Sequence, residues 1–279
     1  MEINESLWPS GLKLVKPRIK KLHYKGNPDL LTSISPKLAV VGSRRMTGYG
    51  EGVIKSWVGV LARRGVIVVS GFMYGVDQAA HEACIENGGK TIAVLGWGIE
   101  RKVSAMDEKL YWKILERDGL ILSEYPGMVG AEKWTFPQRN RIVVGVSDAV
   151  WVVEGAMDSG SMITARLGKT QKKPVLALPG QVGMKVTEGV NNLIKKGDAV
   201  MTTGVEDLFL ALKMERRQQN IVVGMTNDPI MAALESGPKT ADEMLKILKI
   251  SADQLMKKLS MMCLESDVEE VEGRYRKVR

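Results

Sequence analysis

The sequence predicts an α/β protein with a doubly wound, mostly parallel sheet, followed by a small C-terminal domain. Two observations carry this prediction: short apolar runs rich in β-branched residues recur along the chain, and helical patterns separate them. Runs without polar alternation are typical of strands buried on both faces of a parallel sheet. Repeated alternation of strand and helix indicates βαβ units. The expected strands are residues 38–42, 66–70, 91–95, 120–123, 149–153 and 174–178.

Between these strands, apolar residues recur at helical spacing. The segment after Pro137 has the same character. A last helix near residues 205–213 is expected to close the domain. The other expected helices are residues 51–63, 76–87, 107–117 and 162–171.

Composition divides the chain into four segments. Residues 1–37 lack a clean periodicity and contain several prolines, so we expect an N-terminal arm or leader segment packed on a main domain of residues 38–215. Residues 216–227 are the expected linker. Three short helical patterns and a terminal hairpin predict a winged helix over residues 228–279. Its helices are expected at 230–234, 241–248 and 252–259, and its strands near 264–268 and 274–278.

The charge balance favours a polyanionic partner. The chain carries 40 Lys and Arg against 32 Asp and Glu, a formal net charge of +8. Residues 1–37 contribute +4, residues 226–279 contribute −1, and residues 38–225 contribute +5. A basic surface attracts nucleic acid, so we expect any polyanion on the main domain.

The two cysteines, Cys84 and Cys263, lie in apolar helical patterns and are expected to be reduced core residues. The first residues lack the pattern of a signal peptide. No apolar run reaches the roughly 20 residues that span a bilayer. We therefore expect a soluble, cytoplasmic protein.

Ligands of an open α/β sheet bind at the carboxyl ends of the strands, where the strand order reverses. The loop after the first expected strand carries Gly42, Ser43, Arg44 and Arg45, and leads into a helix. Glycine permits close approach to the backbone, a helix N-terminus attracts an anion, and Arg44 can form paired hydrogen bonds with a phosphate. The alternative is a tight turn with a solvated arginine.

The loop after the second strand contains Ser70 and Gly71, followed by Asp77 and His81. Asp77 and His81 stand four residues apart on one helix face, so they could bond each other. We favour a polar pair that orients the helix over a catalytic pair. With His23 as the other histidine, a histidine-based metal site is not expected.

A cluster of cations and aromatic residues follows the fourth strand. Lys133, Arg139 and Arg141 interleave with Trp134 and Phe136. Such a mixture holds single-stranded nucleic acid, because cations follow the backbone while rings stack on bases. We expect this cluster in a proline-bounded loop. The alternative is that the aromatic residues belong to the core and the arginines are solvated.

Small polar residues begin the helix after the fifth strand. Ser159, Gly160, Ser161 and Thr164 could cap that helix or donate hydrogen bonds to a phosphate. Lys172 adds positive charge shortly before the sixth strand. We expect these residues to complete one anion-binding surface.

Cofactor motifs are absent from the sequence. Two Gly-Lys-Thr triplets, at 89–91 and 168–170, resemble Walker A endings, but Cys84 and Ile163 stand where that motif needs its first glycine. Residues 48–52 do not satisfy GxGxxG. We expect no cofactor, no metal and no ATP hydrolysis.

Five motifs occur along the chain in order: Gly42-Ser43-Arg44, Ser70-Gly71 with Gly75-x-Asp77-x-x-Ala80-His81, Phe136-Pro137-x-Arg139-Asn140-Arg141, Ser159-Gly160-Ser161 with Thr164, and Leu178-Pro179-Gly180. This ordered set, over roughly residues 38–210, resembles the DprA/Smf family of DNA-processing proteins. The resemblance implies an extended Rossmann-like fold, without enzymatic activity, that binds single-stranded DNA without reading its sequence. It also implies a homodimer that protects incoming strands in natural transformation and helps load the RecA recombinase.

Carried onto this chain, the resemblance assigns DNA binding to Gly42, Ser43, Arg44, Arg45, Ser70, Gly71, Lys133, Phe136, Arg139, Asn140, Ser159, Gly160, Ser161, Thr164 and Lys172. The winged helix carries little net charge, so we expect it to be regulatory or to contact protein. The family's Tyr-Pro pair after the third strand is missing here, and residues 1–37 are too short for the helical domain that precedes the fold in some members.

Two other functions are weighed against this one. A nucleotide-cleaving phosphoribohydrolase on a related sheet needs a PGGxGTxxE-type segment, and residues 179–185 lack its second glycine and its threonine. A protein adaptor with a vestigial pocket is the third hypothesis. Release of free base from a nucleotide would favour the enzyme, whereas tight oligonucleotide binding would exclude the adaptor.

Overall fold

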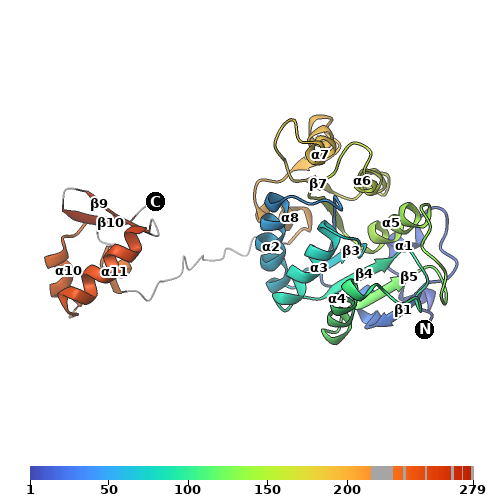
Figure 1. The fold of residues 1–279 in the computed structure, drawn as a ribbon, viewed down its shortest axis with the longest axis horizontal. Coiled ribbons are helices and arrows are strands. Elements are labelled where there is room, and N and C mark those ends of the chain that lie inside the picture. Colours follow the sequence, from blue (N-terminus) through green and yellow to red (C-terminus); the bar gives the residue numbers. More distant parts are fainter. Residues whose placement is uncertain (215–228, 235–236, 249, 265–266, 272, 278–279) are drawn as a thin grey trace. The chain divides into compact units, whose positions relative to one another are not determined.

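The computed structural model describes residues 1–214, 229–234, 237–248, 250–264, 267–271 and 273–277. The chain divides into two compact units, Met1–Glu215 and Arg216–Arg279, shown in Figure 1. The expected linker, 216–227, lies outside the described residues. Within the described part of the chain, no helix is both long and apolar enough to cross a membrane.

The first unit contains an eight-stranded sheet in the order β1-β5-β4-β3-β2-β6-β7-β8. All pairings from β2 to β8 are parallel, and β1 joins the β5 edge in antiparallel fashion. This confirms the predicted fold class. The strands are β1 His23–Gly26, β2 Lys37–Val41, β3 Ile67–Ser70, β4 Thr91–Leu95, β5 Leu120–Ser123, β6 Ala149–Val152, β7 Val175–Ala177 and β8 Val200–Met201.

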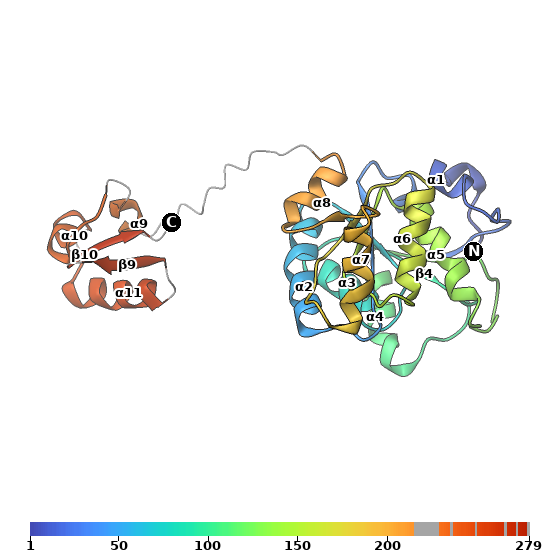
Figure 2. The same ribbon diagram turned by 90° about the horizontal axis from the view of Figure 1, so that it is seen from above.

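Helices cover both faces of the sheet, because its buried strands present apolar side chains to both. Along β2, Ala39 and Val41 pack into one cluster, whereas Leu38 and Val40 pack into the other. Figures 1 and 2 show α1, α5, α6 and α7 on one face and α2, α3, α4 and α8 on the other. Their bounds are α1 Ser10–Lys13, α2 Gly48–Arg63, α3 Val76–Glu86, α4 Ala105–Glu116, α5 Thr135–Val146, α6 Gly160–Thr170, α7 Lys185–Lys195 and α8 Val205–Ala211.

The strand order reverses at β2, which lies between β3 and β6 although β6 follows β5 in the chain. The loops after β2, β3 and β6 therefore leave the same edge of the sheet side by side. This is the place where open α/β sheets bind ligands. The sheet topology thus brings together loops that are more than a hundred residues apart in sequence, as the 107 residues between Thr47 and Glu154 show.

Residues 1–37 are more regular than the sequence predicted. They form two short 3₁₀ helices, η1 Glu5–Leu7 and η2 Pro28–Leu31, in addition to α1 and β1. Trp8, Leu12 and Ile19 are buried in the core cluster on the α5 face. The strand β1 lies at the edge of the sheet and pairs with β5 alone, so its residues are less buried than those of the inner strands. Its sequence, HYKG, therefore has no apolar run from which a strand could be predicted.

The second unit has the predicted order of three helices and a hairpin. Its elements are α9 Pro229–Ala233, α10 Ala241–Leu248, α11 Ala252–Leu264 and the antiparallel strands β9 Val268–Val271 and β10 Arg274–Lys277. The helix α11 continues past residue 259, so the first strand begins later than expected. Ile230, Met244, Leu255 and Tyr275 belong to a separate apolar core. That core gives this unit a hydrophobic interior of its own.

Candidate nucleic-acid-binding site

A pocket of about 720 Å³ lies at the carboxyl edge of the sheet. We call it the first pocket. Its walls come from the loops after β2, β3 and β6 and from the beginnings of α5, α6 and α7. Most of the residues singled out by the sequence line it: Gly42, Ser43, Arg44, Arg45, Gly71, Lys133, Phe136, Arg139, Asn140, Ser159, Gly160, Ser161 and Thr164.

The rim of the first pocket combines an arginine with an aromatic ring. The Arg44 guanidinium carbon lies 5.3 Å from the centre of the Phe136 ring, in a cation–π contact. Phe136 is half-buried and also meets the Trp97 ring edge to face, with 6.3 Å between ring centres. The ring is thereby held in place while it still lines the pocket. The sequence predicted cations of residues 133–141 beside Phe136, whereas the cation over the ring is Arg44, from the loop after β2.

Four exposed cations surround the first pocket: Arg44, Arg45, Lys133 and Lys185. Within the residues that the structure describes, none of them forms an ion pair with a carboxylate. The N-terminal ends of α5, α6 and α7 contribute residues to the same walls. Helix N-termini favour anions, so the cations and the backbone dipoles act in the same direction.

A buried carboxylate fixes the loop that carries Arg44. Glu154, at the end of β6, has no solvent exposure and accepts hydrogen bonds from the backbone N–H of Thr47, at 2.9 Å, and from the Thr47 hydroxyl. Thr47 is the N-cap of α2, and its Oγ1 accepts from the N–H of Gly50. A side chain at Gly50 would collide with Glu154. The contact joins two loops about a hundred residues apart.

Arg139 lies in the floor of the first pocket rather than on its rim. It is 3% exposed, and its Nη1 donates to the carbonyl oxygens of Gly71 and Val94. Burial lowers the Arg139 pKa to about 10, the neighbouring Asp77 opposes this shift, and Arg44 adds to it. Burial likewise raises the pKa of Asp77, while the charge of Arg139 opposes that shift. A side chain at Gly71 would overlap the guanidinium, so glycine is required there.

The possible bond between Asp77 and His81 is not formed. The Nδ1 atom of His81 lies 2.6 Å from the Thr91 hydroxyl, and its Nε2 is buried without a hydrogen-bond partner. Asp77 instead accepts a hydrogen bond from the backbone N–H of Met73. Burial, aided by the charge of Arg139, lowers the His81 pKa to about 3. His81 is therefore a neutral core residue.

The hydroxyl groups at the start of α6 bond mainly to the protein. The Ser159 and Ser161 hydroxyls bond each other, and Thr164 donates to the Gly160 carbonyl at 3.4 Å. Asn140 donates to the same carbonyl, at 3.3 Å, and so joins α5 to α6. Among these residues, Gly160 is exposed and offers its backbone to a ligand.

Two of the residues expected in the site lie elsewhere. The Ser70 hydroxyl is buried and donates to the Val40 carbonyl, so it joins β3 to β2. Lys172 follows the end of α6 and precedes β7. It therefore lies at the amino edge of the sheet, opposite the first pocket, because the helix carries the chain back across the sheet. Sequence proximity to a strand did not reveal which end of that strand Lys172 adjoins.

The cluster after the fourth strand is helical rather than a proline-bounded loop. Residues from Thr135 onward form α5, and Pro137 occupies its first turn, where a missing N–H costs nothing. Trp134 is exposed, so it is not a core residue. Both arginines, in contrast, are buried: Arg139 as described, and Arg141 in an ion pair with Glu124.

Lys185, which lines the first pocket at the beginning of α7, was not among the predicted site residues. Met73, Ala156 and Val186 also line it. The helix α7 was not predicted, although the apolar residues Val186, Val190, Leu193 and Ile194 recur at helical spacing. Reading that spacing would have placed a lysine at a helix start on the carboxyl edge of the sheet. Elsewhere in the described chain, no group of three or more His, Cys, Asp or Glu could hold a metal ion.

The chain is similar to known proteins in sequence and in fold. Residues 1–213 match the family described as DNA recombination-mediator protein A. The chain is 38% identical to the DNA processing protein DprA of Streptococcus pneumoniae over 206 residues, 74% of this chain and 72% of that protein. It is 42% identical to Protein Smf of Escherichia coli over 173 residues, 62% of this chain but 46% of that longer protein. The match therefore spans about half of Protein Smf.

Two solved structures share the fold. The DNA processing protein A of S. pneumoniae superposes with a TM-score of 0.69 at 35% identity, covering 75% of this chain and 72% of that one. The DNA processing protein A of Helicobacter pylori also gives 0.69, at 30% identity, covering 76% of this chain and 95% of that one. The H. pylori structure is described in terms of its single-stranded DNA binding mode.

Proposed function

This chain belongs to the DNA recombination-mediator protein A family, and from that premise we propose that its first unit binds single-stranded DNA in the first pocket. The protein acts there as a binding protein rather than as an enzyme. DNA is held through its phosphates and the faces of its bases, so recognition does not depend on sequence. Binding of a single strand by the H. pylori relative supports this choice of ligand.

The observation that carries the proposal is the pairing of Arg44 with Phe136. Their 5.3 Å separation places a cation and an aromatic ring in one pocket whose other exposed charges are also positive. A nucleotide presents one phosphate and one flat ring, and this pair matches both. Stacking of a base on an aromatic side chain is worth about 1–3 kcal/mol, and it tolerates any base.

The charge part of the proposal is tested by a salt series of binding to a labelled single-stranded oligonucleotide. Replacing both rim cations, Arg44→Ala with Lys133→Ala, should reduce affinity by roughly tenfold or more, and should reduce the log–log salt slope by about 1.4 if each contacts one phosphate. Lys13→Ala, an exposed lysine that does not line the first pocket, is the matched control. An unchanged slope in the double variant would remove the first pocket from DNA binding.

The stacking part is tested separately. Phe136→Ala should lower affinity by about 1–3 kcal/mol and leave the salt slope nearly unchanged, because it removes a ring and no charge. Phe136→Leu keeps apolar volume without the π face and should recover little affinity. Duplex DNA should bind more weakly than a single strand, since its bases are not free to stack. Equal binding of single-stranded and duplex DNA would contradict the stacking role.

The finer family expectations extend this proposal to partners. We propose that the protein acts as a homodimer, protects single strands during natural transformation and assists the loading of RecA. Light scattering at several concentrations measures the oligomeric state. The rate of RecA assembly on an oligonucleotide, with and without this protein, measures the assistance. The Arg44→Ala Lys133→Ala variant should no longer accelerate RecA assembly, because the protein must first bind the strand on which RecA assembles.

A further inference from the structure

A second pocket, of about 560 Å³, lies between the N-terminal segment and α5. We call it the second pocket. It shares no lining residue with the first pocket. None of the residues to which the family resemblance assigns DNA binding belongs to it, although Trp134 and Arg141 come from the cluster of cations and aromatic residues that the sequence singled out. It is lined by Pro17, Arg18, Lys20, Lys21, His23, Glu124, Tyr125, Pro126, Trp134, Gln138 and Arg141.

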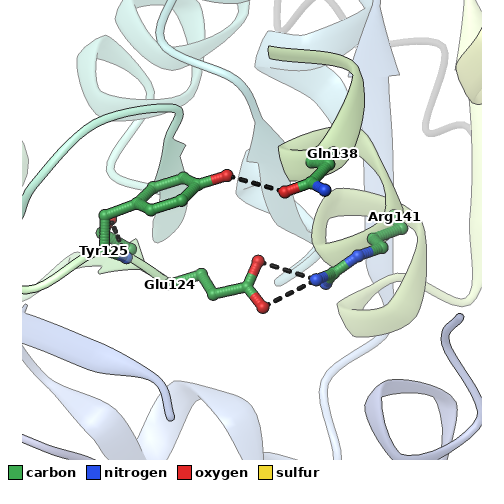
Figure 3. Close-up of polar contacts among 5 residues, drawn as sticks. Glu124, Tyr125, Gln138 and Arg141 are labelled. Atoms are coloured by element: carbon green, nitrogen blue, oxygen red, sulfur yellow. Dashed lines mark hydrogen bonds and ion pairs between the residues drawn. The ribbon is translucent and has the colours of Figure 1, made fainter. Parts of the chain in front are cut away.

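Arg141 has unused capacity to donate hydrogen bonds at this pocket. Its Nη2 alone contacts both carboxylate oxygens of Glu124, at 2.6 and 2.7 Å, as Figure 3 shows. Its Nε and Nη1 are buried and have no hydrogen-bond partner, and the side chain is 4% exposed. An arginine usually engages a carboxylate through two nitrogens, so this pair leaves the guanidinium only partly satisfied.

Aromatic side chains adjoin that charge. The Trp134 ring is 57% exposed and meets the Tyr125 ring edge to face, with 6.1 Å between ring centres. The Tyr125 hydroxyl donates to Gln138 at 3.0 Å and holds the tyrosine against α5, as Figure 3 also shows. The Nε2 atom of His23 is a further buried polar atom without a partner at this pocket. A fixed Tyr125 and an exposed indole offer a stacking surface.

The rim of the second pocket is basic. Arg18, Lys20 and Lys21 line it together with Arg141, against the single carboxylate of Glu124. Arg18 and Lys21 form exposed ion pairs with Glu5 and Glu2. Such exposed ion pairs contribute little to the free energy of folding, so a phosphate can readily replace the carboxylate as the partner of each cation. Lys20 is exposed and, within the described residues, forms no ion pair.

One helix separates the two pockets. Phe136, Pro137 and Asn140 of α5 line the first pocket, whereas Gln138 and Arg141 line the second. Just before the helix, Lys133 lines the first pocket and Trp134 the second. Residues 134, 138 and 141 share one face at helical spacing. A DNA strand that leaves the first pocket over the start of α5 would therefore pass Lys133 and then reach Trp134.

We propose that the second pocket is a further nucleotide subsite, which binds the same single strand after it crosses the start of α5. This inference rests on the proposed function. A base stacks on Trp134, and Lys20 contacts a phosphate. The unpaired nitrogens of Arg141 are shielded from solvent, and Glu124 balances its charge, so the exposed Trp134 and Lys20 make the contacts with the strand. The combination of exposed ring and surplus cations matches a nucleotide better than an acidic peptide, which would use the charge but not the ring.

The test compares two oligonucleotides of the same base composition. One has about four nucleotides, enough for the first pocket, and the other has about twelve, enough to reach both. Trp134→Ala should weaken binding of the longer strand about five- to 150-fold and change that of the shorter strand less than about twofold. Lys20→Ala should lower the salt slope of the longer strand alone, by about 0.7.

An exposed tryptophan and an exposed lysine outside both pockets provide matched controls. Trp112→Ala removes an indole that is also exposed, at 52%, but lines neither pocket, and Lys13→Ala removes a lysine of the same N-terminal segment. Both controls should bind either strand as the unaltered protein does. These variants change exposed side chains, so each should keep the stability of the fold, which a thermal melt verifies.

The outcomes separate this inference from the proposed function. If Trp134→Ala and Lys20→Ala leave the longer strand unaffected while Arg44→Ala Lys133→Ala weakens both strands, the second subsite is wrong and the first pocket stands. If Trp134→Ala weakens both strands equally, the second pocket is not a separate subsite, and the inference is overturned. If the rim variants of the first pocket change neither strand, the proposed function fails, and this inference fails with it.

Discussion

The floor and the rim of the first pocket use the same residue types for different purposes. In the floor, Arg139 and Glu154 are buried and bond to backbone groups of neighbouring loops. On the rim, Arg44 and Lys133 are exposed and form no ion pair among the described residues. Charges in the floor hold the loops in place, while charges on the rim remain available to a ligand. The burial of a charged residue in this pocket therefore decides whether it stabilises the fold or remains available to a ligand.

The two arginines of α5 extend this comparison. Arg139 and Arg141 are two residues apart, and both are 3% exposed. Arg139 is satisfied by carbonyl groups under the first pocket, whereas Arg141 has two unpaired nitrogens beside the second. Residues two apart on a helix point in different directions, so these two arginines of one motif line different pockets.

The largest loss of stability is expected when the buried Arg139 side chain is removed from the floor of the first pocket. Arg139→Ala leaves the Gly71 and Val94 carbonyls without a donor and Asp77 without its counter-charge, and should lower the free energy of unfolding by about 3–5 kcal/mol. Urea unfolding followed by circular dichroism measures it. Arg139→Lys keeps the charge and should lose less. A loss below about 1 kcal/mol in the alanine variant would mean that the floor arginine is not a structural residue.

Removing the other floor residue should disturb the rim as well. Glu154→Ala leaves the two Thr47 donors unpaired and should lower the free energy of unfolding by about 2 kcal/mol. It should also weaken single-strand binding, because the loop carrying Arg44 loses its anchor. Glu154→Gln retains an acceptor oxygen and should show smaller changes in both. Unaltered DNA affinity in the alanine variant would show that the rim is positioned independently of the floor.

The pH dependence of stability should report on the buried histidine beneath the floor. Folding lowers the His81 pKa from its ordinary 6.5 to about 3, so between these values the unfolded chain binds a proton that the folded protein does not. Stability should therefore fall as the pH drops below about 6.5, by up to about 1.4 kcal/mol per pH unit. Asp77, whose pKa is raised, acts in the opposite direction at lower pH.

Urea unfolding of the unaltered protein and of His81→Asn, at about pH 7.5 and about pH 5.5, isolates the histidine contribution. Asparagine does not titrate, so the variant should lose less stability on acidification than the unaltered protein does. The Asp77 contribution is common to both proteins and cancels in the difference. Equal losses would mean that His81 is not held neutral by burial.

The smallest change in the free energy of unfolding is expected when an exposed cation on the rim of the first pocket is replaced. Arg44→Ala should change the free energy of unfolding by less than about 0.5 kcal/mol, because an exposed side chain contributes little to stability. Its effect should instead appear in DNA affinity. The same urea and binding measurements, made on Arg44→Ala and Arg139→Ala side by side, set the two regions against each other. If Arg44→Ala destabilised the protein as much as Arg139→Ala does, the rim and the floor would not differ in their contribution to stability.

The sheet and most of the residues around the first pocket could be predicted from the amino-acid sequence. Continuous apolar runs specify strands buried on both faces, and this local property does not depend on distant contacts. Loops that follow parallel strands must share one edge, so Gly42, Arg44, Gly71 and Ser159 could be assigned to one site before any coordinates were known. The strand β1 was not predicted, because an edge strand has a weaker pattern. The helix α7 was not predicted either, although its apolar residues recur at helical spacing.

What each of these residues does depends on how the whole chain packs. Arg44 follows β2 and Arg139 lies within α5, and no local pattern distinguishes the exposed arginine from the buried one. Lys172 stands close to a strand in sequence, yet the helix before it carries it to the opposite edge of the sheet. The second pocket joins residues 17–23 to residues 124–141, a contact between distant segments. Burial and long-range packing are properties of the whole chain, and for that reason a local pattern could not reveal them.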